Sequence, residues 1–362
     1  MRVANIDREA DVICQMSPIA SLTLRLSDAP RAEDDTQSAH LRLADADRLR
    51  RAESWDDAIV AYRASIGAAA PTDRELLADA NRHLGFCLRM AGRLGPAADA
   101  YAAAASLSYA LRDVRRALLA RIGSAVVVFY RGNLPAAADM LEAVVLEAES
   151  LVATNRELVD VVARAKHDRA TIAHDRGRPE VAVADLYEAF HLYADAAQRD
   201  RVLIDLARAF GDLGLIDVAR DALSLCELSA AGPAARIAAT INLLDLAQRE
   251  DDQVRFEHYR HVLAVEPLVP RHAAYYHLFV GEGLRRFGDA SATDAYERAR
   301  AIAEEHGLNE IVIRTDAALA ASSSAPSIGT RASRAAAYSP AVQRVAASIH
   351  AMHALATAAS DL

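Results

Sequence analysis

Residues typical of turns recur at a fixed interval along this chain, and that interval limits the possible folds more than any other feature. The candidate turn at Gly92–Gly95, counted from Gly95, lies 37 residues before the next candidate at Gly132. The same step of 37 residues connects the later candidates at Gly177, Gly214, Asp251 and Gly288. A unit of this length has room for two helices and a turn, and it cannot bury its apolar faces alone. The sequence therefore predicts an array of stacked helical hairpins.

One interval departs from this series. Gly132 and Gly177 are 45 residues apart, which is 8 more than 37. Eight residues correspond to about two helical turns. We therefore expect longer helices in the third and fourth hairpins, and no additional domain.

Small and large residues alternate on the helix faces that would pack together. Ala97, Tyr101 and Ala104 fall at i, i+4 and i+7, so they share one face of a helix. Small residues allow a neighbouring helix to approach, and the large one fills the remaining gap. The later hairpins repeat the pattern at Ala182, Leu186 and Ala189, at Ala219, Leu223 and Cys226, and at Ala292, Tyr296 and Ala299. The sixth hairpin matches least well, because Phe256 stands where a small residue is expected.

The stretch from Leu84 to Tyr109 resembles the tetratricopeptide repeat (TPR), whose helical hairpin carries the pattern W-x2-L-G-x2-Y, then A-x3-F, then P. The matching residues are Leu84, Gly85, Leu88, Ala97, Tyr101 and Ala104. Asn81 replaces the family's Trp, and Tyr109 replaces its Pro. The 37-residue period is similar to the long TPR variants in the sensor arms of bacterial signalling regulators. The resemblance implies an all-α protein, a right-handed α-solenoid of about eight TPR-like hairpins.

Composition narrows the class of protein further. Hydrophobic residues make up 52% of the chain and aromatic residues only 5%, which suits closely packed, alanine-rich helices. The net charge of −9 disfavours broad binding to nucleic acid or anionic lipid. The three cysteines are scattered and form no C-x-x-C pair, which is typical of a reducing compartment. No leader and no long apolar segment is evident, so we expect a cytoplasmic protein.

No residue pattern indicates catalysis. Lys166 is the only lysine among 41 basic residues, and no P-loop motif is present. The pairs His258 and His261, and His350 and His353, lack an evident third metal ligand, and H-E-x-x-H is absent. We therefore expect no enzyme activity, no cofactor and no metal.

The ends of the chain differ from the repeats. We expect a flexible arm at residues 1–36, with docking of this segment into the groove or onto a partner as the alternative. The solenoid should occupy residues 37–321 and a flexible loop residues 322–338. The 37-residue step predicts that residues 310–320 begin an eighth hairpin and that the helix within 339–362 completes it. The apolar stripe of this helix would cap the end of the stack, or it would bind a partner; it consists of Val342, Val345, Ile349 and Met352.

The TPR resemblance implies that the first helix of each hairpin lines a concave groove that binds partners. Arginine is frequent at the corresponding positions, which would favour an acidic peptide segment or a carboxylate. The alternative is that any exposed helix face in an arginine-rich protein has this composition. The predicted groove residues are Arg82, Phe86, Arg89, Arg164, His167, His174, Arg201, Arg208, Arg249, Tyr275, Arg285 and Arg286.

These observations together predict a non-enzymatic protein–protein interaction scaffold that binds a peptide or a helix in its groove. We expect no direct contact with nucleic acid or membrane. The alternative is a sensory or regulatory subunit of a bacterial signalling system. Its transcription regulator or caspase-like peptidase would be encoded on another chain. The sequence leaves the oligomeric state open.

Overall fold

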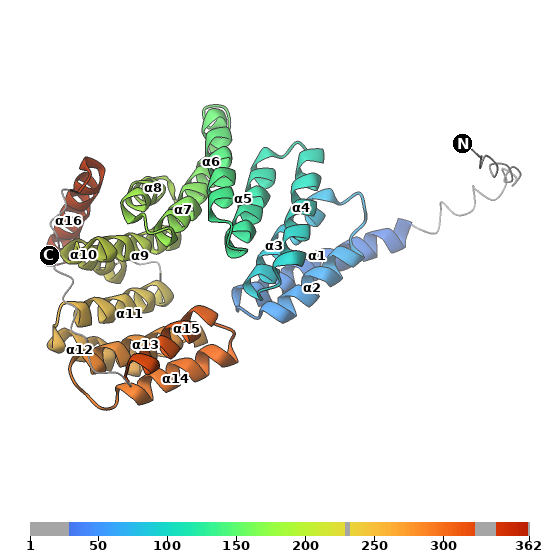
Figure 1. Cartoon of the computed structure of the whole chain (residues 1–362). Helices are drawn as coiled ribbons and strands as arrows, with labels where there is room; N and C mark the ends of the chain where they lie inside the picture. Colours follow the sequence, from blue (N-terminus) through green and yellow to red (C-terminus); the bar gives the residue numbers. More distant parts are fainter. Residues whose placement is uncertain (1–28, 229–231, 323–337, 361–362) are drawn as a thin grey trace, which may run out of the picture. The chain divides into compact units, whose positions relative to one another are not determined.

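The computed structural model describes residues 29–228, 232–322 and 338–360 (Figure 1). All regular structure in these ranges is helical, and no strand occurs in them, so the predicted all-α class is confirmed. The chain forms two compact units, residues 1–117 and 118–362, whose boundary lies within helix α5. Each unit is described by itself below. None of the helices in the described ranges is long and apolar enough to cross a membrane.

The first unit contains two helical hairpins, in which α1 packs on α2 and α3 packs on α4. The sequence placed residues 29–36 in a flexible arm, and this was wrong because these residues are helical. Pro30 does not oppose a helix at this position, because a proline in the first turn of a helix costs no hydrogen bond. Residues 1–28 of the predicted arm lie outside the described residues. The helices are α1 (Ala29–Arg51), α2 (Trp55–Ala68), α3 (Arg74–Met90), α4 (Leu94–Ala110) and the start of α5 (Val114–Tyr130).

The second unit continues with four hairpins, α7/α8, α9/α10, α11/α12 and α13/α14, which follow α6. The first helices of these hairpins contact one another in chain order, since α7 touches α9, α9 touches α11 and α11 touches α13. The helices are α6 (Leu134–Leu151), the 3-10 helix η1 (Arg156–Leu158), α7 (Val159–Asp175), α8 (Pro179–Leu192), α9 (Ala196–Leu213), α10 (Ile216–Leu228), α11 (Pro233–Arg249), α12 (Gln253–Ala264), α13 (Pro270–Arg286), α14 (Ala292–Glu305), α15 (Asn309–Ser322) and α16 (Pro340–Ser360).

Left-handed turn residues mark the predicted turns between paired helices. Gly132, Gly177, Gly214 and Gly288 have φ between +70° and +84°, and Asp251 has φ of 61°. In the second hairpin the turn residue is Gly92, with φ of 72°, whereas Gly95 lies inside α4. The interval from Gly92 to Gly132 is therefore 40 residues, and the predicted interval of 37 was wrong at this hairpin. Steps of 37 hold from Gly177 onward.

The long interval between Gly132 and Gly177 has two causes. Helix α6 has 18 residues and α8 has 14, which accounts for four of the eight additional residues. The connection from α6 to α7 spans residues 152–158 and contains η1, whereas the connection from α8 to α9 spans only residues 193–195. Our expectation of longer helices was right for α6 and wrong for α7, because the other four residues lie in the connection.

Close contacts within two hairpins, α3/α4 and α13/α14, confirm there the predicted packing of small against large residues. A methyl group at Gly85 would lie 3.0 Å from the ring of Tyr101, and one at Gly281 would lie 2.7 Å from the ring of Tyr296. Phe256 is fully buried although it replaces a small residue. Its ring fits over Gly283 on α13, where a methyl group would lie only 2.1 Å away. The next hairpin thus supplies the space that Phe256 needs.

The C-terminal helix α16 does not pair with α15. It packs against α10 and α8, beside which it lies in Figure 1, while α15 packs on α14 and α13. Val342 and Ile349 are fully buried and Val345 nearly so, in the core that α7 to α10 form. The predictions of an eighth hairpin and of a cap at the end of the stack were therefore wrong. Most of the predicted loop, residues 323–337, lies outside the described residues.

Polar contacts fix the register of α16 on this surface. The Tyr338 hydroxyl donates to the Leu213 carbonyl at 2.8 Å, and the hydroxyls of Tyr187 and Ser348 are 2.6 Å apart. The Nδ1 atoms of His350 and His353 lie 2.5 and 3.1 Å from the two carboxylate oxygens of Asp221 on α10. Because these contacts run from Tyr338, just before α16, to His353 within it, the helix has one defined position.

Candidate functional site

The candidate site in the second unit is the surface formed by the first helices of successive hairpins, α7, α9, α11 and α13, which we call the A-helix face. Since these helices follow one another at 37 residues, a residue at n lies beside a residue near n+37 on the next helix. His167 Nε2 lies 2.8 Å from Asp205, and His174 Nε2 lies 2.9 Å from Asp212. Arg249 in turn lies 3.5 Å from Asp212. These pairs join α7 to α9 and α9 to α11, and we call them the inter-repeat ion pairs.

The surroundings of His174 favour its charged form. The side chain is 16% exposed, and its two ring nitrogens lie 3.6 Å from Asp175 and 2.9 Å from Asp212. The contacts with Asp175 and Asp212 raise the pKa of His174 to about 9, against an opposing effect of burial. The same contact with His174 lowers the pKa of Asp212. His174 is therefore an imidazolium at neutral pH, and its charge is used inside the protein.

Arginines on the A-helix face also have acidic neighbours. Arg164 donates to Asp168 at 3.0 Å, and Arg208 donates to Asp205 at 3.3 Å. Arg249 lies 2.8 Å from Asp245, one turn away on its own helix. The frequency of arginine on this face therefore does not create a surplus of positive charge, because aspartates at matching positions neutralise it.

Arg201 is the exception among the predicted arginines of this face. It is exposed, and it makes no hydrogen bond or ion pair with any of the residues that the structure describes. The nearest aspartate on the same helix face, Asp205, is already bound by His167 and Arg208. Arg201 therefore presents a guanidinium to solvent, one turn from this occupied carboxylate.

The three predicted residues on α13, Tyr275, Arg285 and Arg286, make different kinds of contact. The Tyr275 hydroxyl donates to Glu310 at 3.2 Å, and its ring lies 5.8 Å from that of Phe279. Arg285 instead donates to the Ala318 carbonyl at 3.1 Å and lies over the ring of Tyr296, so it serves the packing of α13 with α14 and α15. Arg286 is paired with Asp251 at the preceding turn. Of these three, only Tyr275 lies in line with the positions of Arg201 and Arg164, at multiples of 37 residues.

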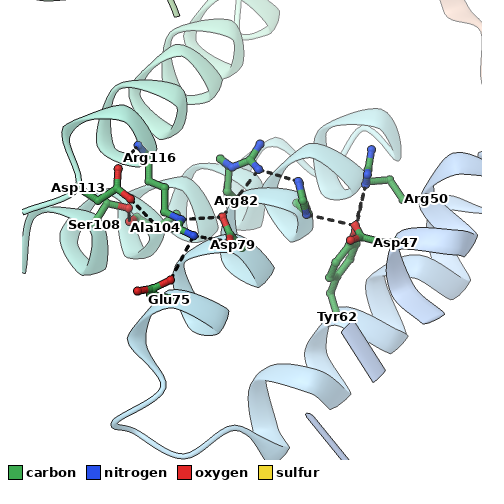
Figure 2. A network of polar contacts seen from close by, with 11 residues as sticks. Asp47, Arg50, Tyr62, Glu75, Asp79, Arg82, Ala104, Ser108, Asp113 and Arg116 are labelled. Carbon is green, nitrogen blue, oxygen red and sulfur yellow. Dashed lines mark hydrogen bonds and ion pairs between the residues drawn. The ribbon is translucent and has the colours of Figure 1, made fainter. Parts of the chain in front are cut away.

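In the first unit the predicted residue Arg82 belongs to a polar network rather than to an open surface (Figure 2). Arg82 Nη2 lies 2.8 Å from His83 Nε2, and His83 Nδ1 lies 3.3 Å from Asp47 on α1. Tyr62 donates to Asp47 at 2.5 Å. Burial tends to raise the pKa of Asp47, but the hydrogen bonds from His83 and Tyr62 outweigh it and lower that pKa. Asp47 is therefore a fixed anion that binds α1, α2 and α3 together.

The other end of this network lies at the start of α5, as Figure 2 also shows. Arg116 donates two hydrogen bonds of 3.2 Å to the carboxylate of Asp79 on α3, and a third of 2.6 Å to Asp113. Arg116 and Asp79 are 37 residues apart, so this contact repeats the spacing of the inter-repeat ion pairs. Bonds to the two aspartates raise the pKa of Arg116 further.

Phe86 and Arg89 form an aromatic cluster with the single tryptophan. The rings of Trp55 and Phe86 meet edge to face at 5.8 Å, and the Arg89 guanidinium lies 5.0 Å from the centre of the Phe86 ring. Both side chains are only partly exposed. The contact places Trp55 against the next hairpin, which the sequence did not reveal.

The acidic partners Asp205 and Asp212 were missing from the sequence-based site. They lie 38 residues after His167 and His174, one more than the 37-residue step between first helices, so a search one repeat further along the chain would have found them. Among the described residues, no group of three or more His, Cys, Asp or Glu side chains is arranged to hold a metal ion. Whether the predicted groove residues contact a partner stays a prediction.

Comparison with known proteins gave matches only among solved structures. No family model and no curated protein matches the chain. A tetratricopeptide repeat protein from Parabacteroides merdae is 14% identical, with a TM-score of 0.48, over 77% of this chain and 99% of that one. BtubC (BKLC) from P. vanneervenii is 19% identical, with a TM-score of 0.42, over 66% of this chain and 95% of that one.

A third structure, the TPR domain of P58(IPK), is 13% identical, with a TM-score of 0.24, over 87% of this chain and 98% of that one. The fold is identified from the hairpins themselves. Their helices pair in chain order, their turns fall at the repeat interval, and small residues such as Gly85 and Gly281 receive the aromatic rings of the second helix. On this packing the chain is a TPR-like helical repeat protein.

Proposed function

We propose that this protein is a protein–protein interaction scaffold that binds a peptide or a helix along the A-helix face of its second unit. The observation that carries the proposal is the state of Arg201, which is exposed and makes no hydrogen bond or ion pair within the described residues, whereas Arg164, Arg208 and Arg249 on the same face are paired with aspartates. An arginine in this position can bind a carboxylate with two parallel hydrogen bonds. The partner's contact there would be a single acidic group, and not an extended acidic segment.

The neighbouring residues support a mixed contact. Arg208 lies two turns from Arg201 on α9, and Tyr275 occupies the equivalent position on α13, at twice the 37-residue step. Tyrosine and arginine are the residue types that most often dominate binding energy at protein interfaces. Because the inter-repeat ion pairs hold the helices in register, these side chains are presented on a preorganised surface, which lowers the entropic cost of binding.

The test compares two charge reversals of equal size. Peptides selected against the full chain from a random library would be titrated by fluorescence anisotropy onto wild type, Arg201→Glu and Arg298→Glu. Arg298 is the matched control, an exposed arginine on α14, the second helix of its hairpin. We expect Arg201→Glu to weaken binding by about tenfold or more, the usual cost of replacing a charge-assisted bond by repulsion. Equal affinity for wild type and Arg201→Glu would contradict the proposal.

The sequence suggested an acidic partner, whereas the proposal requires only one acidic group, opposite Arg201. A partner bound through many acidic residues would have to displace the aspartates that already occupy Arg164, Arg208 and Arg249. The alternative function, a regulatory subunit of a signalling system, stays a prediction.

A further inference from the structure

A cavity in the second unit is lined in part by residues of the longer, 45-residue interval between the turns at Gly132 and Gly177. A seven-residue connection joins α6 to α7, whereas a three-residue connection joins α8 to α9. A cavity of about 430 Å³ lies there between α6, α7 and α8. Its volume is within the range of small-molecule sites. The cavity thus lies beside the connection in which this repeat differs from the later ones.

Most of the cavity wall is apolar. Val152 comes from the connection, Val159 and Val162 come from α7, and Leu192 comes from the end of α8. The rings of Tyr187 and His191 form a further part of the wall. They lie nearly perpendicular to each other, with their centres 4.5 Å apart. Aliphatic side chains favour an apolar ligand, and an aromatic face additionally favours a cation.

The polar edge of the cavity carries a net negative charge. Lys166, the only lysine of the protein, is 8% exposed and lies 2.9 Å from Glu149 and 2.6 Å from Glu188. Burial alone would lower the pKa of Lys166, but its hydrogen bonds to the two glutamates outweigh burial and raise that pKa. One ammonium and two carboxylates leave a charge of −1. The glutamate side chains remain 45% and 57% exposed, so they can accept further hydrogen bonds.

We propose that this cavity binds a small apolar amine, with its hydrocarbon part among the valines and its ammonium on Glu149 and Glu188. A carboxylic acid of the same shape would meet two carboxylates, and it could reach Lys166 only by breaking ion pairs that are already made. A neutral alcohol would gain the apolar burial without the charge. The sign of the ligand charge therefore decides the affinity. The proposal does not depend on peptide binding at the A-helix face.

The experiment uses three probes of similar shape. Phenethylamine, phenethyl alcohol and hydrocinnamate would be titrated by isothermal calorimetry onto the full chain at neutral pH. We expect the amine to bind about tenfold tighter than the alcohol, as for a charge-assisted hydrogen bond, and the acid to bind weakest. Equal affinities for all three probes, tighter binding of the acid, or no binding of the amine at millimolar concentration would overturn the proposal.

Three variants locate the binding. Glu188→Gln should reduce the affinity for the amine to that for the alcohol, because the edge then has no net charge. Val152→Phe should block all probes by filling the cavity, and Val152 is only partly buried, so the substitution is compatible with folding. Glu304→Gln is the matched control, since Glu304 is an exposed glutamate paired with Arg300 at 2.9 Å on α14. Unchanged binding to Val152→Phe with preserved helical circular dichroism would place the ligand elsewhere and refute the assignment.

Discussion

Replacing His174 by glutamine tests whether the inter-repeat ion pairs stabilise the second unit. The pKa of His174 is raised from 6.5 to about 9 in the folded chain. A rise of about 2.5 in pKa corresponds to an upper limit of about 3.4 kcal/mol. The Asp212 side chain is 47% exposed, and water therefore screens the pair. We expect the interaction between His174 and Asp212 to contribute about 1–2 kcal/mol to the free energy of unfolding. This value covers both residues together.

The direction of the pH dependence follows from the direction of the pKa change. Because the folded pKa of His174 lies above the unfolded value of 6.5, its contribution is fully present below pH 6.5. It is lost as the pH rises through about 9, where the folded imidazolium deprotonates. The His174→Gln variant should be less stable than wild type at about pH 6, and the difference should disappear at about pH 9.5.

The measurement is urea unfolding of both proteins, followed by circular dichroism at several pH values across this range. His261→Gln serves as the control, because this ring is 74% exposed and its carboxylate neighbour Glu257 is 4.0 Å away. The control should show no pH-dependent difference from wild type. A difference between wild type and His174→Gln that stays constant across the range would show that the histidine acts through packing and not through its charge.

Three further predictions concern packing and the C-terminal helix. Gly283→Ala should destabilise the protein by about 1–3 kcal/mol in urea unfolding, because the new methyl group overlaps the ring of Phe256; unchanged stability would mean that Phe256 has room to move. Cys87 and Cys226 should resist alkylation at pH 8 until the chain unfolds, since both are buried and burial raises the pKa of each thiol; rapid labelling of both in the native protein would contradict this. Asp221→Asn should increase hydrogen exchange of α16 amides by about 2- to 30-fold, as for the loss of up to ~2 kcal/mol, and an unchanged exchange rate would show that the apolar contacts alone hold the helix.

Much of the fold could be predicted because a repeat protein carries the same pattern of small, large and turn residues in each hairpin. The small residues and the rings they receive, such as Gly85 and Tyr101, occur at positions fixed by the helical period. The turn residues showed the repeat length directly from Gly177 onward. The turn at Gly92–Gly95 was predicted, but its interval was counted from Gly95, whereas Gly92 is the glycine that adopts a left-handed conformation.

The candidate site could be predicted less well, because the state of a charge depends on the neighbouring helix. The first-helix positions of Arg201 and Arg208 follow from the repeat, but only Arg208 is paired, since Asp205 lies within reach of it and of His167. Arg285 illustrates the other failure. It is at an expected groove position, yet it turns to a carbonyl of α15 and to the ring of Tyr296. The sequence identifies such residues, and only the packing decides which way they point.

The position of α16 could not be predicted, because an apolar stripe specifies that a helix packs but not which surface receives it. The stripe of Val342, Val345 and Ile349 suits any exposed apolar groove. What distinguishes α8 and α10 are polar partners, Tyr187 for Ser348 and Asp221 for the two histidines. These partners are more than 120 residues away in the sequence, so no local pattern connects them.

The distribution of these features follows from the symmetry of the array. Where the 37-residue step is kept, each interface resembles the next, and the charged residues are used to join neighbouring helices, as in the pairs of His174 and Arg249 with Asp212. A site for one particular ligand needs surroundings that occur once. The longer interval before α7 supplies them, because it brings the only lysine to a cavity edge and leaves Tyr187 between that cavity and α16. The irregular interval is therefore where a small-ligand site is to be sought, while the regular helices hold the A-helix face in register for the proposed peptide partner.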